Sequence, residues 1–480
     1  MNKILVFLLL FVISFANAQK NLKPVRLGQV TEAWLAGERE SCISQLQKIY
    51  ESDRTNLITV YNLGYLNYLQ GNLSQALKLF SEAKLIDLNY PYSNLNISKI
   101  YEVSGNLISA KNILLAGLKT KSDNYQLQIA LARIYYKLGE TAAAIEQYLN
   151  IIDDFEEEFE PKIELAAIYR QQKNFKAVKN LLEFDDNEYP SSSALIEKYR
   201  YFRDSGQIEN AKEILINICS AYPRSEDLKI YQDTLLLKYH LEQVPEPEKI
   251  PKYNYIFDPK EKLNYMVEYG FLKLGWLKVR VEDELIINGR KVYRVVFYID
   301  SNPDFDFVIA LHHIYESYID AETLSAVRSR LYTPDGDDNF VRMYYFDYDI
   351  NKFHSYAVKT DGRYEFVEKN LPNAAQDGTS MLYLARGLVS NKSDGKTVVV
   401  INEKFKYAII DFLNEIEEVE VKDKDVNATK IFAQAKFSGV AGMNGDAYGW
   451  FSNDNQSMPL QGEIKIIIGS ITVMVDDQDN

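Results

Sequence analysis

Histidine and carboxylate side chains are the first candidates for catalysis or metal binding in this chain of 480 residues. His312 and His313 are adjacent, and neighbouring residues of a strand point to opposite faces, so both cannot bind one metal ion there. The other two histidines are His240 and His354. The sequence has no His-Glu-x-x-His motif, no Gly-x-Ser-x-Gly elbow and no phosphate-binding glycine loop. We therefore expect no catalytic residue, no metal ion and no cofactor.

Acidic residues gather in two short stretches that could bind calcium weakly. The first holds Asp304 and Asp306, and the second holds Asp335, Asp337 and Asp338. Both stretches are rich in turn-forming residues, and turns favour Asp on conformational grounds. We interpret these carboxylates as solvated turn residues. Paired acids need no linear motif, so catalysis by carboxylates alone stays an alternative.

Basic and aromatic residues recur at spacings that would place them on one inner surface of a repeat array. The predicted groove residues are Tyr61, Tyr65, Tyr68, Lys99, Arg133, Tyr136, Lys137, Arg170, Arg200 and Arg203. Guanidinium groups match carboxylates bidentately. We predict that this groove binds an acidic or C-terminal segment of a protein partner. The alternative is a solvated helix face whose charges pair locally, for instance with Glu102 or Asp204.

The elements that would position this groove are revealed by an internal period. A small or aliphatic residue opens each second helix at Ile43, Ala76, Ala110, Ala144, Val178 and Ala211, and the spacings are 33, 34, 34, 34 and 33. Gly71, Gly105, Gly139 and Gly206 follow the first helices, where a residue with positive φ ends a helix. Residues 23–224 resemble tetratricopeptide repeat proteins, whose period is 34 residues. We expect an array of about six repeats with a capping helix, over residues 23–242, whose first helices line the concave surface.

A proline-rich stretch, residues 243–259, marks a domain boundary, because Pro245, Pro247, Pro251 and Pro259 stiffen it. Beyond it the hydrophobic period changes to two residues, which is typical of strands. We expect one or two strands over 265–281, kinked at Gly270 and Gly275. Further strands are expected at 279–287, 292–299, 315–319, 325–332, 341–348, 353–359, 397–401, 406–412, 416–421, 430–437, 449–453 and 462–475. Asn288 and Gly289 predict a tight hairpin, and Asp377 is expected to cap a helix over 379–388. The predicted fold is a mostly antiparallel half-barrel or open barrel with one short helix, over residues 260–476.

This second half resembles a family of exported bacterial domains of unknown function. The resemblance rests on residues 265–270 with Gly275, on 315–320, on 376–386 and on 449–470. It also looks like the half-barrel of lipoprotein carriers, which implies a sheet that binds a lipid or another hydrophobic ligand. That step is an analogy of fold, which does not settle function. The alternative is a filled core, since most apolar stripes serve packing.

The N-terminus predicts export. Lys3 precedes an apolar run over residues 4–15, and Ala16-Asn17-Ala18 is a small-x-small cleavage site, so residues 1–18 are expected to be a signal peptide. No cysteine follows the site, so we expect a periplasmic or outer-membrane-associated protein that is not a lipoprotein. The two cysteines, Cys42 and Cys219, are interpreted as buried free thiols. A net charge of −14 argues against nucleic acid as a partner.

Together these features predict a non-enzymatic adaptor of the cell envelope. The repeat groove would capture a protein, and the β domain would bind an envelope component, such as a lipid. Two alternatives are an enzyme that acts on a cell-surface glycan and is recruited through its repeats, and a pure assembly scaffold.

Overall fold

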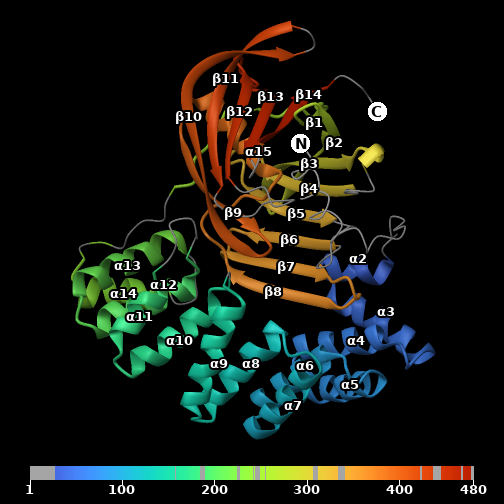
Figure 1. The fold of residues 1–480 in the computed structure, drawn as a ribbon, viewed down its shortest axis with the longest axis vertical. Helices are drawn as coiled ribbons and strands as arrows, with labels where there is room; N and C mark the ends of the chain where they lie inside the picture. The colour runs from blue at the N-terminus through green and yellow to red at the C-terminus, as the bar shows by residue number, and fades with distance from the viewer. Residues whose placement is uncertain are drawn as a thin grey trace, which may run out of the picture.

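The computed structural model confirms the predicted fold class: a helical array precedes a mostly antiparallel β domain with one helix (Figure 1). The structure describes residues 28–156, 158–183, 190–223, 228–241, 243, 249–254, 256–305, 312–332, 341–421, 424–435, 445–465 and 469–476. The predicted signal peptide, Pro245, Pro247, Asp306 and the acidic stretch 335–338 lie outside these residues.

The helical array consists of antiparallel helix pairs that follow the predicted repeat. Its first helices are α2 (Gln29–Leu35), α4 (Leu57–Leu69), α6 (Pro91–Val103), α8 (Tyr125–Lys137), α10 (Glu160–Gln171) and α12 (Ser192–Asp204). Its second helices are α3 (Arg39–Ser52), α5 (Leu73–Ile86), α7 (Leu107–Thr120), α9 (Thr141–Asp154), α11 (Phe175–Leu181) and α13 (Ile208–Ala221). The predicted turn glycines have φ between 77° and 81°, which is the left-handed region. The array ends in α14 (Leu228–Asp233) and a π-helical turn, η2 (Thr234–Lys238).

Small residues bring the two helices of a pair together. Gly64 of α4 faces α5, where an added Cβ would lie 3.1 Å from the ring of Phe80. Ala76, Ala110, Ala144 and Ala211 are fully buried in the same role. Cys42 and Cys219 are both buried and free, as predicted. Desolvation raises the pKa of the Cys42 thiol to about 12 and that of Cys219 to about 11, so both stay neutral at ordinary pH.

The β domain is a single antiparallel sheet. Its strands are β1 (Lys262–Tyr269), β2 (Leu272–Ile287), β3 (Arg290–Ser301), β4 (His312–Asp320), β5 (Ala326–Tyr332), β6 (Val341–Asp347), β7 (Lys352–Val358), β8 (Tyr364–Asn370), β9 (Gly395–Ile401), β10 (Lys404–Val421), β11 (Lys424–Ala435), β12 (Gly445–Ser452), β13 (Pro459–Lys465) and β14 (Ser470–Val475). The order is β8-β7-β6-β5-β4-β3-β2-β1-β14-β13-β12-β11-β10-β9, so β8 and β9 are the edges. The hairpin at Asn288 and Gly289 joins β2 to β3 as predicted.

The predicted strands differ from the observed ones in three places. The segments 406–412 and 416–421 form one strand, β10, because a bulge at Phe412–Glu415 absorbs the irregularity without ending the pairing. The segment 462–475 is a hairpin, β13 and β14, that turns before Ser470. The strand β8 was not predicted at all. It follows a turn at Asp361 and Gly362, whose φ is +84°.

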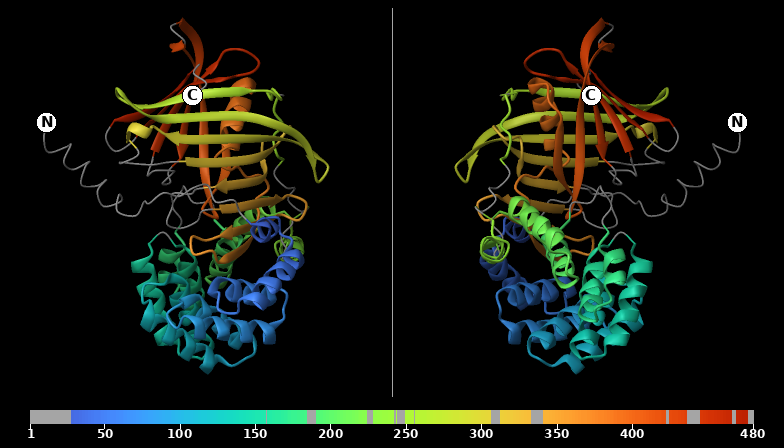
Figure 2. Two further views of the ribbon diagram at one scale, coloured as in Figure 1. Left: turned by 90° about the vertical axis from the view of Figure 1, so that its right-hand side faces the viewer. Right: turned by 90° about the vertical axis from the view of Figure 1, so that its left-hand side faces the viewer.

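The sheet curls around one helix, α15 (Ser380–Asn391), which packs on its concave side (Figure 2). The N-cap position is Thr379, and the predicted capping residue Asp377 lies two positions before it and accepts a hydrogen bond from Ser380 N, the first N–H of the helix. One side of α15 packs Tyr383 against β1 to β4, and the other packs Leu384 and Leu388 against β10 to β12. Buried Arg386 pairs with Glu261 at 2.7 Å and donates to the carbonyls of Ile256 and Gln456. The concave side is therefore occupied by a packed core, which favours the filled-core alternative.

Candidate binding groove

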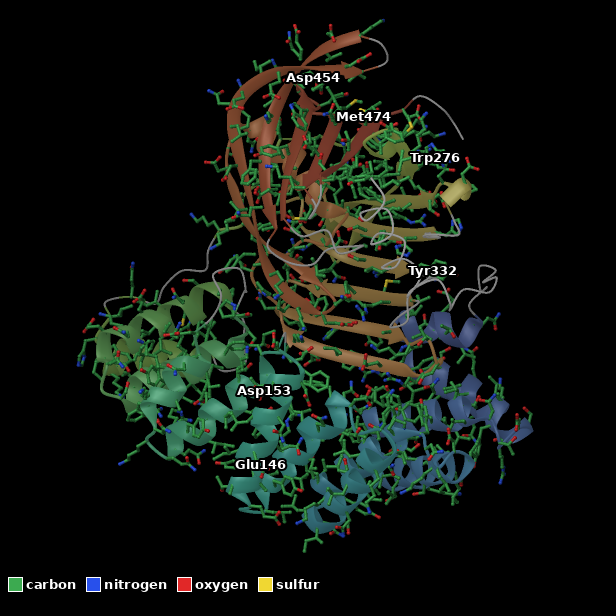
Figure 3. The ribbon with its side chains drawn as sticks, in the orientation of Figure 1. Glu146, Asp153, Trp276, Tyr332, Asp454 and Met474 are labelled. Carbon is green, nitrogen blue, oxygen red and sulfur yellow. The ribbon has the colours of Figure 1, made fainter. Side chains whose placement is uncertain are left out.

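The strand β8 lies along the inner face of the first repeat units, so the array contacts its own β domain (Figure 1). Side chains from the array and from the sheet fill the space between them (Figure 3). One hydrophobic cluster joins residues of α2 to α6 with Val341, Tyr356, Val358 and Tyr364 of the sheet. The groove that sequence analysis assigned to a separate partner is, in these units, occupied by an edge strand of the same chain.

The side-chain amide of Asn62 both donates to and accepts from the backbone at the start of this strand. Its Nδ2 donates to the Gly362 carbonyl at 3.0 Å, and its Oδ1 accepts from Tyr364 N at 2.9 Å. Three residues further along α4, the Tyr65 hydroxyl accepts from Phe366 N at 3.1 Å. Residues three apart lie on one face of a helix, and residues two apart lie on one side of a strand. The two side chains therefore satisfy successive N–H groups of a sheet edge that would otherwise stay unpaired.

The tyrosines of α4 are covered by this contact. Tyr61 is 3% and Tyr65 is 9% exposed, and Tyr68 is half-buried. Desolvation raises the pKa of each phenol above its ordinary value, since the charged form is disfavoured in an apolar site. The prediction that Tyr61 and Tyr65 present an open surface is wrong, because β8 packs on them.

Trp34 of α2 anchors the first repeat to the sheet. It is fully buried, and its ring stacks on Tyr364 with centroids 4.9 Å apart. Its indole Nε1 donates to the Ala357 carbonyl at 3.0 Å, and Tyr345 donates its hydroxyl to Leu35 O at 2.7 Å. A buried indole that finds a hydrogen-bond partner adds orientation to hydrophobic contact. This contact fixes α2 against β6 and β7.

Charged and polar contacts extend the interface along the turn between β7 and β8. Arg363 lies over the ring of Tyr92, 3.6 Å from its centroid, and Tyr90 donates its hydroxyl to Asp361 at 3.2 Å. Gln126 of α8 donates to Glu365 at 3.2 Å. Lys359 pairs with the same carboxylate at 2.6 Å, and these partners hold the pKa of Glu365 below its usual range despite burial. The interface therefore runs along the array from α2 to α12, where Asn370 donates to the Ser192 hydroxyl at 2.9 Å, and Lys404 pairs with Glu158 between these ends at 3.0 Å.

The predicted basic residues do lie on the inner helices, but most of them pair with nearby carboxylates, either in an adjacent unit or on the same helix. The ion pairs join Arg133 to Glu160 and Glu164, Lys137 to Glu102, Arg170 to Glu197 and Asp204, Arg200 to Glu197, and Arg203 to Asp204. Tyr136 donates to Gln171 at 2.6 Å. The structure therefore shows the local pairing that the sequence offered as the alternative. The role of these residues in binding a separate protein stays a prediction.

Burial differs strongly along this row. Arg170 and Glu197 are 12% and 3% exposed at the side chain, so their pair is structural. Lys99 is half-buried near Glu365, and desolvation lowers its pKa. Lys137 and Arg200 keep 53% and 48% of their side chains exposed. Only the exposed members retain the solvent access that a second protein would need.

The residues that sequence reasoning missed are those that recognise backbone. Asn62 and Trp34 carry no charge and belong to no motif. The missed strand β8 could have been found from the turn residues Asp361 and Gly362 followed by partial alternation over residues 364–367. No pattern in the sequence pairs that strand with α4, because the contact spans about 300 positions of the chain.

The histidines of β4 lie apart from one another. His312 is exposed beside Asp300, whereas His313 is buried beside Tyr315, on the other side of the strand as predicted. Within the described ranges, no three His, Cys, Asp or Glu residues are grouped so that they could hold a metal ion. Over the same ranges, no helix combines the length and apolar character needed to cross a membrane.

Comparison with known proteins assigns the two halves separately. Residues 264–476 match the family model described as "Protein of unknown function (DUF3108)". The β domain matches a family without an assigned function. That match covers less than half of the chain, and a comparison with curated protein sequences finds no match.

The helical half is similar to solved tetratricopeptide repeat structures. A protein from Parabacteroides merdae ATCC 43184 shares 15% identity, with 44% of this chain and 88% of that chain covered and a TM-score of 0.36. MamA shares 14% identity over 38% of this chain and 99% of its own, with a TM-score of 0.30. YrrB, titled "a TPR protein with an unusual peptide-binding site", shares 17% over 41% and 98%, with a TM-score of 0.29. These scores are too low to support an inference about a partner.

Proposed function

We propose that this protein is a non-enzymatic adaptor of the bacterial cell envelope. Its repeat array packs on its own β domain, and the residues of the inner surface that stay exposed bind a second protein. The observation that carries this proposal is the bidentate contact of Asn62 with Gly362 and Tyr364. It is a contact between a repeat helix and extended backbone, which is how a groove holds another protein. A scaffold role agrees with it better than catalysis does.

The surface proposed for the second protein is formed by Lys137, Arg200 and Arg203. Their side chains are 53%, 48% and 38% exposed. The partly exposed pairs of Lys137 with Glu102 and of Arg203 with Asp204 are worth little, about 0–1 kcal/mol each, so an incoming carboxylate can exchange for the present partner there at small cost. An acidic segment or a C-terminal carboxylate is the chemistry that the guanidinium groups of Arg200 and Arg203 fit.

Export to the periplasm or to the outer membrane follows from the predicted signal peptide and belongs to this proposal. The β domain is proposed to contact an envelope component. Because α15 and its neighbours fill the concave side of the sheet, we favour contact through the outer surface over an enclosed lipid.

Binding in trans is tested by fluorescence anisotropy with a labelled acidic peptide that ends in a free carboxylate. We expect salt-sensitive binding that Arg200→Glu with Arg203→Glu weakens at least about tenfold, or about 1.4 kcal/mol. The matched control, Lys176→Glu with Lys212→Glu, makes the same charge change on the second helices α11 and α13. If both double variants weaken binding equally, the effect comes from net charge and not from the assigned surface. Unchanged binding by the arginine variant would refute the assigned surface. Because reversal also places charge beside Glu197, Arg200→Gln with Arg203→Gln is measured as a milder variant.

A further inference from the structure

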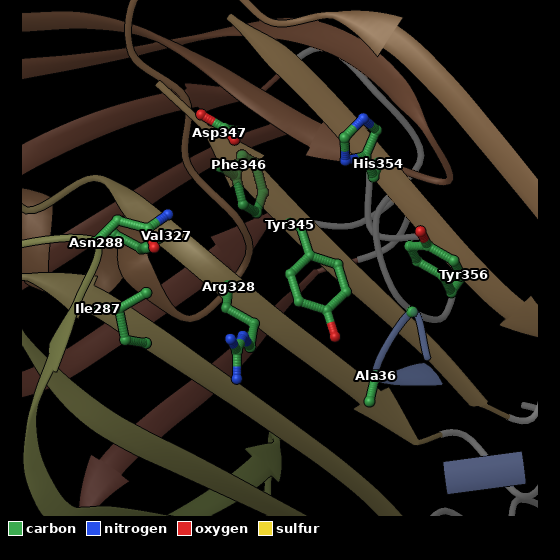
Figure 4. Close-up of a pocket in the computed structure, with 11 residues that line it drawn as sticks. Ala36, Ile287, Asn288, Val327, Arg328, Tyr345, Phe346, Asp347, His354 and Tyr356 are labelled. Atoms are coloured by element: carbon green, nitrogen blue, oxygen red, sulfur yellow. The ribbon is translucent and has the colours of Figure 1, made fainter. Parts of the chain in front are cut away.

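A second candidate site lies on the outer face of the sheet, where the β domain meets the first repeat (Figure 4). It is a pocket of about 250 Å³. Its walls come from the turn between α2 and α3, from the β2–β3 hairpin and from strands β5 to β7. It is separate from the inner groove that holds β8 and from the ion pairs of the later repeats.

Arg328 supplies a positive charge to the wall of this pocket. Its guanidinium lies 5.4 Å from the ring centre of Tyr318 and 5.0 Å from that of Tyr345, and Figure 4 shows Arg328 and Tyr345 side by side. In the part of the chain that the structure describes, its buried Nε has no hydrogen-bond acceptor. A buried donor without an acceptor is costly, by about 1–3 kcal/mol in typical proteins. An incoming oxyanion would remove that cost.

The carboxylates around Arg328 are engaged elsewhere. Glu316 accepts from Arg294 and from Tyr318, and Glu32 pairs with Arg330 at 2.8 Å. Asp347 lines the pocket but accepts from the backbone N–H groups of Asp349 and Ile350, which holds it in the β6–β7 turn. None of these contacts occupies Arg328 Nε.

A second guanidinium reinforces the positive character of this region. Arg39 lies over the rings of Phe366 and Tyr356, at 4.6 and 5.9 Å from their centres, and Tyr356 is itself a pocket wall. Arg39 opens α3, whose N-terminal end adds partial positive charge. Glu38 and Glu40 flank that helix start, and both are exposed to solvent, where water screens them more strongly.

The turn at Gly37 determines how closely the repeat approaches the sheet. Gly37 has a φ of +75°, and an added Cβ would lie 3.3 Å from the Tyr356 hydroxyl oxygen. Only glycine combines this backbone conformation with such a close contact. The resulting pocket has a polar wall at Arg328 and Asn288 and an apolar wall at Ile287.

We infer that this pocket binds a small organic carboxylate of about the size of one amino acid. The guanidinium matches a planar carboxylate in a bidentate manner. The tyrosine rings and Ile287 would contact the apolar part of the ligand. The volume is below the roughly 300–1,000 Å³ of pockets for drug-sized ligands, so the part of a ligand that the pocket holds is small.

The test is isothermal titration calorimetry of the full chain with N-acetyl-L-phenylalanine, with its carboxamide, with N-acetylmuramic acid and with inorganic phosphate. We expect a carboxylate to bind with a Kd of roughly 1 mM, as fits a ligand of this size, and the carboxamide to bind at least about tenfold more weakly. Binding of the amino acid indicates a peptide terminus as the source, and binding of the muramic acid indicates an acidic sugar. Binding of phosphate alone, or equal binding of acid and amide, would overturn the inference.

Three variants assign the binding to this pocket. Arg328→Gln should weaken the carboxylate at least about tenfold. Arg330→Gln, on the same strand and the same face, should not change the Kd, because Arg330 pairs with Glu32. Asn288→Asp adds negative charge at the rim while keeping an Asp-Gly hairpin turn, so it should weaken binding without disturbing the fold. If Arg328→Gln and Asn288→Asp both bind as the parent does, the site is wrong.

Discussion

At the scale of single residues, backbone recognition by Asn62 decides the position of the edge strand. Asn62 is 2% exposed, and both of its amide atoms are used by the β7–β8 segment. Removing it leaves the Gly362 carbonyl and the Tyr364 N–H without partners inside a packed contact. Each unsatisfied buried group costs about 1–3 kcal/mol.

We predict that Asn62→Ala lowers the free energy of unfolding by about 2–4 kcal/mol, since two buried groups lose their partner. The matched control is Asn67→Ala on the same helix, whose side chain donates to Leu63 O within α4. That change should cost less than about 1 kcal/mol. Urea denaturation followed by circular dichroism measures both, and equal losses would mean that Asn62 has no special part in the interface.

Burial of phenols at the interface predicts a loss of stability at alkaline pH. Burial raises the pKa of Tyr61, Tyr65 and Tyr364 in the folded chain above the value near 10 of an unfolded chain. The folded state then holds these protons more tightly, so their contribution is complete below pH 10 and falls as pH rises above it. The slope should reach about 1.4 kcal/mol per pH unit for each such tyrosine.

Absorbance at 295 nm, recorded together with circular dichroism over pH 9 to 12, follows tyrosinate formation and folding. We expect a late group of tyrosines that ionises only as the structure is lost, and Tyr65→Phe should reduce that group. Ionisation of all tyrosines near pH 10 in an intact fold would contradict the described burial.

At the scale of elements, charge pairs tie each repeat unit to the next. Lys137 reaches Glu102 of the preceding unit, and Arg170 reaches Asp204 of the following one, 35 and 34 positions away. These sequence separations are close to the repeat period, so each pair joins similar levels of two neighbouring inner helices. The buried pair of Arg170 and Glu197 is the strongest candidate for a structural role.

Arg170→Ala should lower the free energy of unfolding by roughly 3 kcal/mol, because it leaves the carboxylate of Glu197 buried without its main partner. Arg203→Ala should cost less than about 1 kcal/mol, since Arg203 is 38% exposed. Thermal unfolding of both variants compares them directly. A small effect at Arg170 would show that water replaces the lost guanidinium.

The elements also show what sequence could and could not predict. The period of the repeats and the turn glycines predicted the array, because each hairpin repeats the same local packing. The Asn288–Gly289 turn and the Asp377 cap were predictable, since both are local. The strand β8 was not predicted, and local pairing of the basic residues was only an alternative, because both depend on contacts between distant parts of the chain. Sequence alone places Arg133 on the inner helix but cannot show that Glu160 and Glu164 reach it.

At the scale of the whole molecule, each half covers a surface that the other leaves open. An edge strand presents unpaired N–H and C=O groups, which promote aggregation. The β8 edge is covered by the inner helices of the array. The β9 edge is covered by the segment before α15, where Gln376 pairs with the backbone of Val398 and Val400. The array likewise buries aromatic residues of its first units against the sheet, so the halves should behave as one folded body.

The most direct test of this account is to cut the chain between the two halves. A specific protease site is placed in the stretch 243–249, and the cleaved protein is passed over a size-exclusion column with light scattering. We predict that the two fragments stay together as one particle with the mass of the uncut chain. With Asn62→Ala and Trp34→Ala combined, the same cut should let the fragments separate. Separation of the fragments from the otherwise unchanged chain would contradict the claim that the array holds its own β domain.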